Sequence, residues 1–132
     1  MVHKRIELKD YFEFLGDNGA NPFVDMYLPY NMVEMNRQNQ KRPCMIVCPG
    51  GGYGFCSERE SEPLALHFLP EGFNVFVITY SVAPHRFPTQ LCEVAALMEL
   101  IYKKNLNPTF ICESAGTQAE DAKSMKDYYL GL

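Results

Sequence analysis

The sequence predicts an α/β fold, in which strands and helices alternate along most of the chain. A short, continuous apolar run at residues 44–48 and a largely apolar segment at 73–80 indicate strands that are buried on both faces of a parallel sheet. Each run is followed by a segment with helical spacing of its apolar residues, at 57–69 and 89–104. Alternation of this kind implies parallel strands joined by right-handed crossovers.

The remaining elements are expected at the two ends of the chain. Residues 5–15 partly alternate between apolar and polar, and 23–29 form a second strand candidate after a segment dense in turn formers. This start indicates an antiparallel strand pair. A last strand is expected at 109–112 and a last helix at 118–130. With 132 residues, the chain has the length of a single domain.

The composition is typical of a soluble globular protein, with 47% hydrophobic and 21% charged residues. A net charge of -4 and the lack of a basic cluster argue against nucleic acid or an anionic membrane as the main partner. No apolar run approaches the ~18 residues of a membrane span, and residues 1–10 lack the apolar core of a signal peptide. Five cysteines without zinc-type spacing indicate thiols in a reducing compartment. We therefore expect a cytoplasmic protein without a cofactor or metal.

Three consecutive glycines, Gly50, Gly51 and Gly52, directly follow the strand at 44–48. They remove three side chains where the backbone leaves the sheet, so that backbone N–H groups can turn toward a developing oxyanion or a phosphate. A tight strand-to-helix turn with no such role would use the same glycines. A P-loop is excluded because no Gly-Lys-Ser/Thr follows, and a dinucleotide site is excluded because the GxGxxG spacing is absent.

Two segments resemble α/β-hydrolases of the acetyl-xylan esterase and hormone-sensitive-lipase-like groups. RPCMIVCPGGGY at 42–53 is similar to their third strand and oxyanion loop, with Pro49 where those families often have histidine. YSVAPHRFP at 80–88 is similar to their Tyr-Arg-x-Ala-Pro…Phe-Pro loop. The resemblance runs from about residue 22 to 102. It implies a truncated α/β-hydrolase-like three-layer sandwich, whose sheet is mostly parallel with an N-terminal antiparallel strand pair.

The same resemblance implies a carboxylic-ester hydrolase acting on short acyl or acetyl esters. Its oxyanion hole would lie at Gly50, Gly51, Gly52 and Tyr53, with the N–H groups of Gly51 and Gly52 as donors. The nucleophile of such enzymes stands in Gly-x-Ser-x-Gly, on a tight strand-to-helix turn. The candidate here is Ser114 in CESAG at 112–116, although cysteine replaces the first glycine and the next segment is polar and acidic.

The catalytic triad is incomplete in this sequence. In α/β-hydrolases the order is Ser, then an acid, then His, but no histidine follows Ser114. Among the three histidines, His85 in the loop at 80–88 is the better candidate base, and His67 is most simply a packed or surface helix residue. General-base assistance is typically worth about 10²–10⁴ in rate. We therefore expect weak or absent esterase activity. The alternative is a non-catalytic remnant that folds, or associates with itself through an exposed sheet edge.

The end of the chain carries a second resemblance. Residues 107–129 look like the last strand and helix of a xylose-isomerase-like TIM barrel of the endonuclease IV type. That family has a metal-binding glutamate at the end of this strand, where this chain has Glu113. The other His and carboxylate ligands are not visible, so Glu113 alone is not expected to bind a metal. On this interpretation, the single domain 1–132 joins a hydrolase-like half at 1–102 to a β-α tail of doubtful origin at 103–132.

Three further acidic residues, Glu58, Glu60 and Glu62, lie at the start of the segment with helical spacing at 57–69. Carboxylates in this position suit the positive N-terminal end of a helix dipole. We prefer this interpretation to a metal site.

Overall fold

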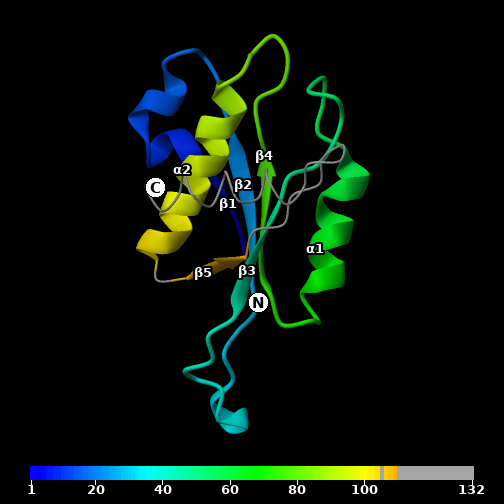
Figure 1. Ribbon diagram of the computed structural model, residues 1–132. Helices are drawn as coiled ribbons and strands as arrows, with labels where there is room; N and C mark the ends of the chain where they lie inside the picture. The colour runs from blue at the N-terminus through cyan, green and yellow to red at the C-terminus, as the bar shows by residue number, and fades with distance from the viewer. Residues whose placement is uncertain (105, 110–132) are drawn as a thin grey trace.

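The computed structural model describes residues 1–104 and 106–109, and its strands form one mixed sheet in the order β1-β2-β4-β3-β5. The strands are β1 (Val2–Glu7), β2 (Phe23–Leu28), β3 (Pro43–Val47), β4 (Asn74–Thr79) and β5 (Asn107–Thr109). Helices α1 (Glu62–Phe68) and α2 (Thr89–Lys103) lie on opposite sides of this sheet (Figure 1). Short 3-10 turns occur at Leu8–Asp10, Glu13–Gly16, Val33–Met35 and Glu58–Glu60.

The strand pairing confirms the antiparallel start of the sheet and adds a second antiparallel contact. β1 and β2 form the predicted antiparallel pair. However, β2 also runs antiparallel to β4, while β3 runs parallel to both β4 and β5. The sheet is therefore mixed: among the described strands, β2 alone runs against the other four, and it does so beside both of its neighbours. Sequence periodicity identified β2 as a strand but could not show that it would insert beside β4.

The first strand is shorter than predicted. The partial alternation at 5–15 suggested one long strand, but β1 ends at Glu7 and two 3-10 turns follow it. The Leu8 N–H still donates to the Pro22 carbonyl oxygen at 3.1 Å, in register with the strand pair, and the 3-10 turn begins at this residue. Leu8 and Leu15 are buried in the core. Their apolar character comes from this packing and not from a continuing strand.

The other boundaries shift by a few residues. The helix expected at 57–69 begins at Glu62, after the separate turn Glu58–Glu60, and Pro63 stands in its first turn, where proline is tolerated. The last strand begins at Asn107, earlier than expected. Residues 110–132, which include Glu113, Ser114 and the expected last helix, lie outside the described residues.

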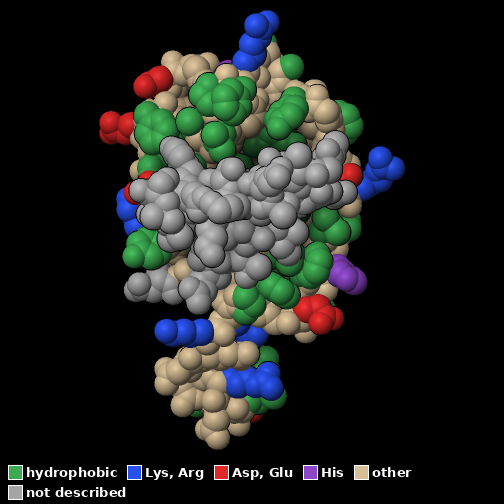
Figure 2. Space-filling model, viewed as in Figure 1, with side chains coloured by type: hydrophobic (Ala, Val, Ile, Leu, Met, Phe, Trp, Pro, Cys, Tyr) green, Lys and Arg blue, Asp and Glu red, His purple; other side chains and the backbone are tan. Residues whose placement is uncertain are grey.

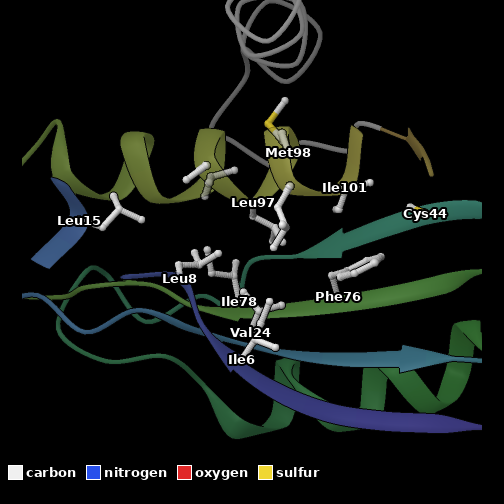
Figure 3. Close-up of a cluster of buried hydrophobic side chains, with 13 residues drawn as sticks. Ile6, Leu8, Leu15, Val24, Cys44, Phe76, Ile78, Leu97, Met98 and Ile101 are labelled. Carbon is white, nitrogen blue, oxygen red and sulfur yellow. The ribbon is translucent and has the colours of Figure 1, made fainter. Parts of the chain in front are cut away.

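Buried apolar side chains cover both faces of the sheet. One core cluster joins α2 and the first 3-10 turns to the sheet, and Figure 3 shows Leu97 of α2 directed toward Ile78 of β4 and Val24 of β2. The second cluster packs Ala65 of α1 against the opposite face. β4 is central and covered on both sides, which explains its continuous apolar run. No helix in the described part of the chain is long and apolar enough to cross a membrane.

Candidate active site

The candidate site lies where β3 and β4 end. These strands are parallel neighbours, so the loops after their carboxyl ends meet at the same edge of the sheet. We call residues 49–55 after β3 the glycine loop, and residues 80–88 after β4 the proline loop. The fold thus brings together the two segments that the sequence singled out.

Three contacts join the glycine loop to the proline loop. The Ala83 N–H donates to the Tyr53 carbonyl oxygen at 2.7 Å, and the Tyr80 hydroxyl donates to the Pro49 carbonyl oxygen. The Tyr53 and Tyr80 rings meet edge-on, with centroids 6.1 Å apart. Burial raises the pKa of Tyr80 to about 12, so its hydroxyl keeps the donated proton at neutral pH. The two loops therefore form one hydrogen-bonded unit.

Close contacts exclude a side chain at Gly51 and would displace a neighbouring side chain at Gly50. A Cβ at Gly51 would stand 2.0 Å from the Phe55 carbonyl oxygen, so that position 51 excludes every side chain. A Cβ at Gly50 would stand 2.8 Å from the Glu60 carboxylate oxygen Oε2. The glycines therefore do more than permit a tight turn: they let the Phe55 carbonyl and the Glu60 carboxylate approach the backbone closely.

Tyr53 has the left-handed backbone conformation, with φ of 59°. This conformation costs a non-glycine residue about 1–2 kcal/mol and persists where the surrounding structure fixes it. The Ala83 N–H and the Tyr80 ring supply that fixation here. A strained residue held in place by a second loop is a feature that clusters at functional sites.

The N–H groups of the glycine loop differ in their partners. The Gly50 N–H donates to Glu60 Oε2 at 2.7 Å. By contrast, no residue in the described part of the chain accepts the N–H of Gly51, Gly52 or Tyr53. Of the four residues predicted to form the oxyanion hole, three thus have backbone donors that are not engaged by described residues, and the fourth has a carboxylate partner.

The proline loop is fixed from α2 by two side chains. Glu93 is fully buried, and its Oε2 accepts the Ser81 N–H at 2.8 Å. Gln90 Nε2 donates to the carbonyl oxygens of Ser81 and His85, at 2.9 and 3.0 Å. Burial raises the pKa of Glu93, and this outweighs the hydrogen bond from Ser81 and the charge of His85, which lower it. Glu93 Oε1 has no hydrogen-bond partner among the described residues.

The raised pKa of Glu93 predicts a loss of stability at higher pH. A carboxyl with a higher pKa in the folded than in the unfolded protein binds its proton more readily when folded. The free energy of unfolding should therefore fall as the pH rises from 4.5, the ordinary pKa of a glutamate, to the raised pKa of Glu93 in the folded protein. Glu93→Gln keeps an oxygen acceptor for Ser81 and removes the titration, so the variant should lose this part of the pH dependence.

Urea unfolding at several pH values from 4 to 8 measures the effect. The matched control is Glu99→Gln, because Glu99 is on the same helix but exposed, in an ion pair with Lys103. The control should follow the wild-type pH profile. A Glu93→Gln profile that also follows the wild type would contradict the assignment.

The structure places His85 in the proline loop, half-buried and near enough to Glu93 for its charge to act on that carboxyl. This is the end of the sheet where the glycine loop lies. The described residues therefore bring His85 and Gly50–Tyr53 to one region. Ser114, the candidate nucleophile, and Glu113 are outside those residues, so neither is placed relative to the two loops.

The other two histidines lie elsewhere. His67 is exposed in the last turn of α1, edge-on to Phe68. His3 stacks on Tyr27 where β1 pairs with β2, toward the opposite end of the sheet. These positions agree with the interpretation of His67 as a helix surface residue.

Sequence reasoning missed two residues that shape the site. Glu60 belongs to the acidic group that we assigned to a helix dipole, and nothing in the sequence indicates its contact with Gly50 ten residues earlier. Glu93 gives a clearer signal, because it lies between the buried-face residues of an amphipathic helix. A carboxylate in that position needs a buried partner.

The surface at this end of the sheet is rich in aromatic side chains. Tyr53, Phe55 and Phe87 are 63%, 60% and 80% exposed, so each presents most of a ring to solvent. Figure 2 shows hydrophobic side chains gathered on this end of the molecule. Within residues 1–104 and 106–109, no three His, Cys, Asp or Glu side chains form a group that could hold a metal ion.

Comparisons with known proteins find α/β-hydrolases. The chain is similar to MGS-M1, an α/β hydrolase from a Medee basin deep-sea metagenome library, with 31% identity and a TM-score of 0.65. It is also similar to an acetyl ester-xyloside bifunctional hydrolase from Caldicellulosiruptor lactoaceticus, with 28% identity and a TM-score of 0.65. A curated relative, endo-1,4-beta-xylanase B of Butyrivibrio fibrisolvens, is 36% identical over 70 residues. No family model matches the chain.

The extent of these matches is partial. The two structural alignments cover 80% of this chain but 40% and 39% of the hydrolases. The match to the xylanase covers 48% of this chain and 11% of that protein. The chain thus spans about two fifths of the length of the hydrolase structures, and the fold is truncated relative to them.

Proposed function

The described part of the chain has the α/β-hydrolase esterase fold, and on this premise we propose that it carries the oxyanion loop of a serine carboxylesterase for short acyl or acetyl esters. The observation that carries the proposal is the glycine loop. It presents the N–H groups of Gly51 and Gly52 without an acceptor among the described residues, in a backbone fixed by neighbouring contacts. In acyl transfer, hydrogen-bond donors that are already in position where the negative charge develops usually contribute most to stabilising the transition state.

In the proposed reaction, the Ser114 hydroxyl oxygen attacks the ester carbonyl carbon and gives its proton to a base. The carbonyl oxygen becomes an oxyanion that accepts hydrogen bonds from the Gly51 and Gly52 N–H groups. The alcohol leaves with a proton, and water then releases the acyl group from Ser114 as an acid. His85 is the candidate base, because its loop is hydrogen-bonded to the glycine loop.

A short acyl group on a carbohydrate is the substrate class that we favour. The structural relative from Caldicellulosiruptor acts on acetyl esters and xylosides by its name, and the curated relative is a xylanase. Exposed Tyr53 and Phe55 of the glycine loop and Phe87 of the proline loop supply aromatic faces, suited to packing against a sugar ring or an apolar group.

The second candidate is the same architecture without turnover. The incomplete triad favours it, since no histidine follows Ser114 in the sequence. We therefore expect slow chemistry in the esterase case. The two candidates share the fold and differ in whether Ser114 is activated.

Labelling with a fluorophosphonate probe, followed by intact mass, separates the two candidates. We expect a single, slowly formed adduct on the full chain, and none on Ser114→Ala. Ser81→Ala is the control, because Ser81 lies in the proline loop but is not the proposed nucleophile, and it should still be labelled. A folded wild-type sample without an adduct would overturn the esterase proposal and support the second candidate.

A further inference from the structure

Glu60 makes a contact that the proposed reaction does not by itself require. Its carboxylate oxygen Oε2 accepts the Gly50 N–H at 2.7 Å, across ten residues of sequence. This length is typical of a charge-assisted hydrogen bond, which is roughly twice as strong as a neutral one. The partner is the first glycine of the loop, directly before the two N–H groups of the proposed oxyanion hole.

The backbone of Glu60 is held in place by its own turn. The Glu60 N–H donates to the Ser57 carbonyl oxygen at 3.1 Å, and the Ser61 Oγ donates to the same oxygen at 2.9 Å. Ser57 in turn donates its N–H to the Gly50 carbonyl oxygen at 2.8 Å. One turn therefore binds the Gly50 N–H through Glu60 and the Gly50 carbonyl through Ser57.

Position 50 is suited to this approach. A Cβ there would stand 2.8 Å from Oε2, so that a side chain would push the carboxylate away. The contact also removes the Gly50 N–H from the donors available to a ligand. Among the three glycines, the N–H groups of Gly51 and Gly52 therefore remain for an anion, since no described residue accepts them.

We propose that Glu60 is a positioning residue, which fixes the Gly50 peptide so that the following N–H groups point into the oxyanion hole. This inference rests on the proposed esterase function. Glu60 acts through the backbone and does not touch the substrate. Without it, the contacts of Tyr80 with the Pro49 carbonyl and of Ser57 with the Gly50 carbonyl remain, but the Gly50 N–H loses its acceptor, and the donors after it are held less firmly in direction.

The test combines a spectroscopic readout with a kinetic one. In the full chain labelled with ¹⁵N-glycine, the Gly50 amide proton should move upfield in Glu60→Ala, because its charged acceptor is lost. Glu60→Gln, which keeps a neutral oxygen acceptor, should show a smaller shift. Glu58→Gln is the matched control, because Glu58 lies in the same turn but is not the residue that accepts the Gly50 N–H, and it should leave this resonance unchanged.

The kinetic readout is the rate of fluorophosphonate labelling at Ser114. We expect Glu60→Ala to slow it about tenfold, less than the roughly 10²–10³ lost with a donor itself, and Glu60→Gln to recover part of the rate. Thermal unfolding checks that all variants are folded.

The outcomes distinguish the two proposals. An unchanged Gly50 resonance in folded Glu60→Ala would overturn the contact, and a shifted resonance with an unchanged labelling rate would overturn the positioning role. If the wild type is not labelled but its Gly50 resonance depends on Glu60, the esterase proposal and the role of Glu60 in it both fail, and the contact alone stands.

Discussion

Gly51→Ala is expected to displace the N–H groups of the glycine loop that are proposed to bind the oxyanion. The rate of fluorophosphonate labelling at Ser114 should fall about 10²-fold or more. The alanine Cβ would stand 2.0 Å from the Phe55 carbonyl oxygen, which is backbone and cannot rotate away. The peptide groups around Gly51 must therefore move, and the N–H groups proposed to bind the oxyanion move with them. Overpacking of this kind typically costs about 1–3 kcal/mol in folding stability as well.

Gly52→Ala is the matched control for this prediction. Gly52 has a left-handed φ of 60°, but nothing lies within 4 Å of a Cβ built there. Alanine should cost about 1–2 kcal/mol through backbone strain alone and leave the neighbouring residues in place. Thermal unfolding and probe labelling of both variants measure the difference. Equal losses of labelling in the two variants would show that the clash with Phe55 is not the cause of the loss in Gly51→Ala.

Leu97→Ala is expected to cause the largest loss of stability outside the loop, about 2–5 kcal/mol. Leu97 is fully buried at the centre of the core between α2 and the sheet (Figure 3). Its removal takes away apolar contacts and leaves a cavity against β4 and β2. Urea unfolding measures the effect as a lower midpoint with an unchanged dependence on urea concentration.

Leu66→Ala serves as its control, because Leu66 is also a helical leucine but is 53% exposed on α1. We expect it to change the free energy of unfolding by no more than about 0.5 kcal/mol. Similar losses in the two variants would contradict the assignment of Leu97 to the core.

Much of the fold followed from local pattern. The apolar runs located β3 and β4 because a strand covered on both faces needs apolar residues at every position. The spacing of apolar residues located α2 almost to its ends. Local pattern failed at residues 8–15, where buried leucines in 3-10 turns imitate the alternation of a strand.

The candidate site was predicted in part. Three glycines after a buried strand, together with the proline loop, indicated an oxyanion loop, and the fold places those two segments in contact. Glu60 and Glu93 were not predicted as site residues, since each acts on a backbone N–H distant in sequence, and no local pattern records such a pairing.

The sequence by itself therefore determined the α/β class, the main elements, the hydrolase resemblance and the loop that carries the proposed chemistry. These features depend on the periodicity of side chains and on short motifs, which are local properties. The tertiary structure alone decided that β2 lies antiparallel beside β4 and that a carboxylate engages the first of the three glycines. Those features depend on which distant segments meet, and the packing of the whole domain sets that.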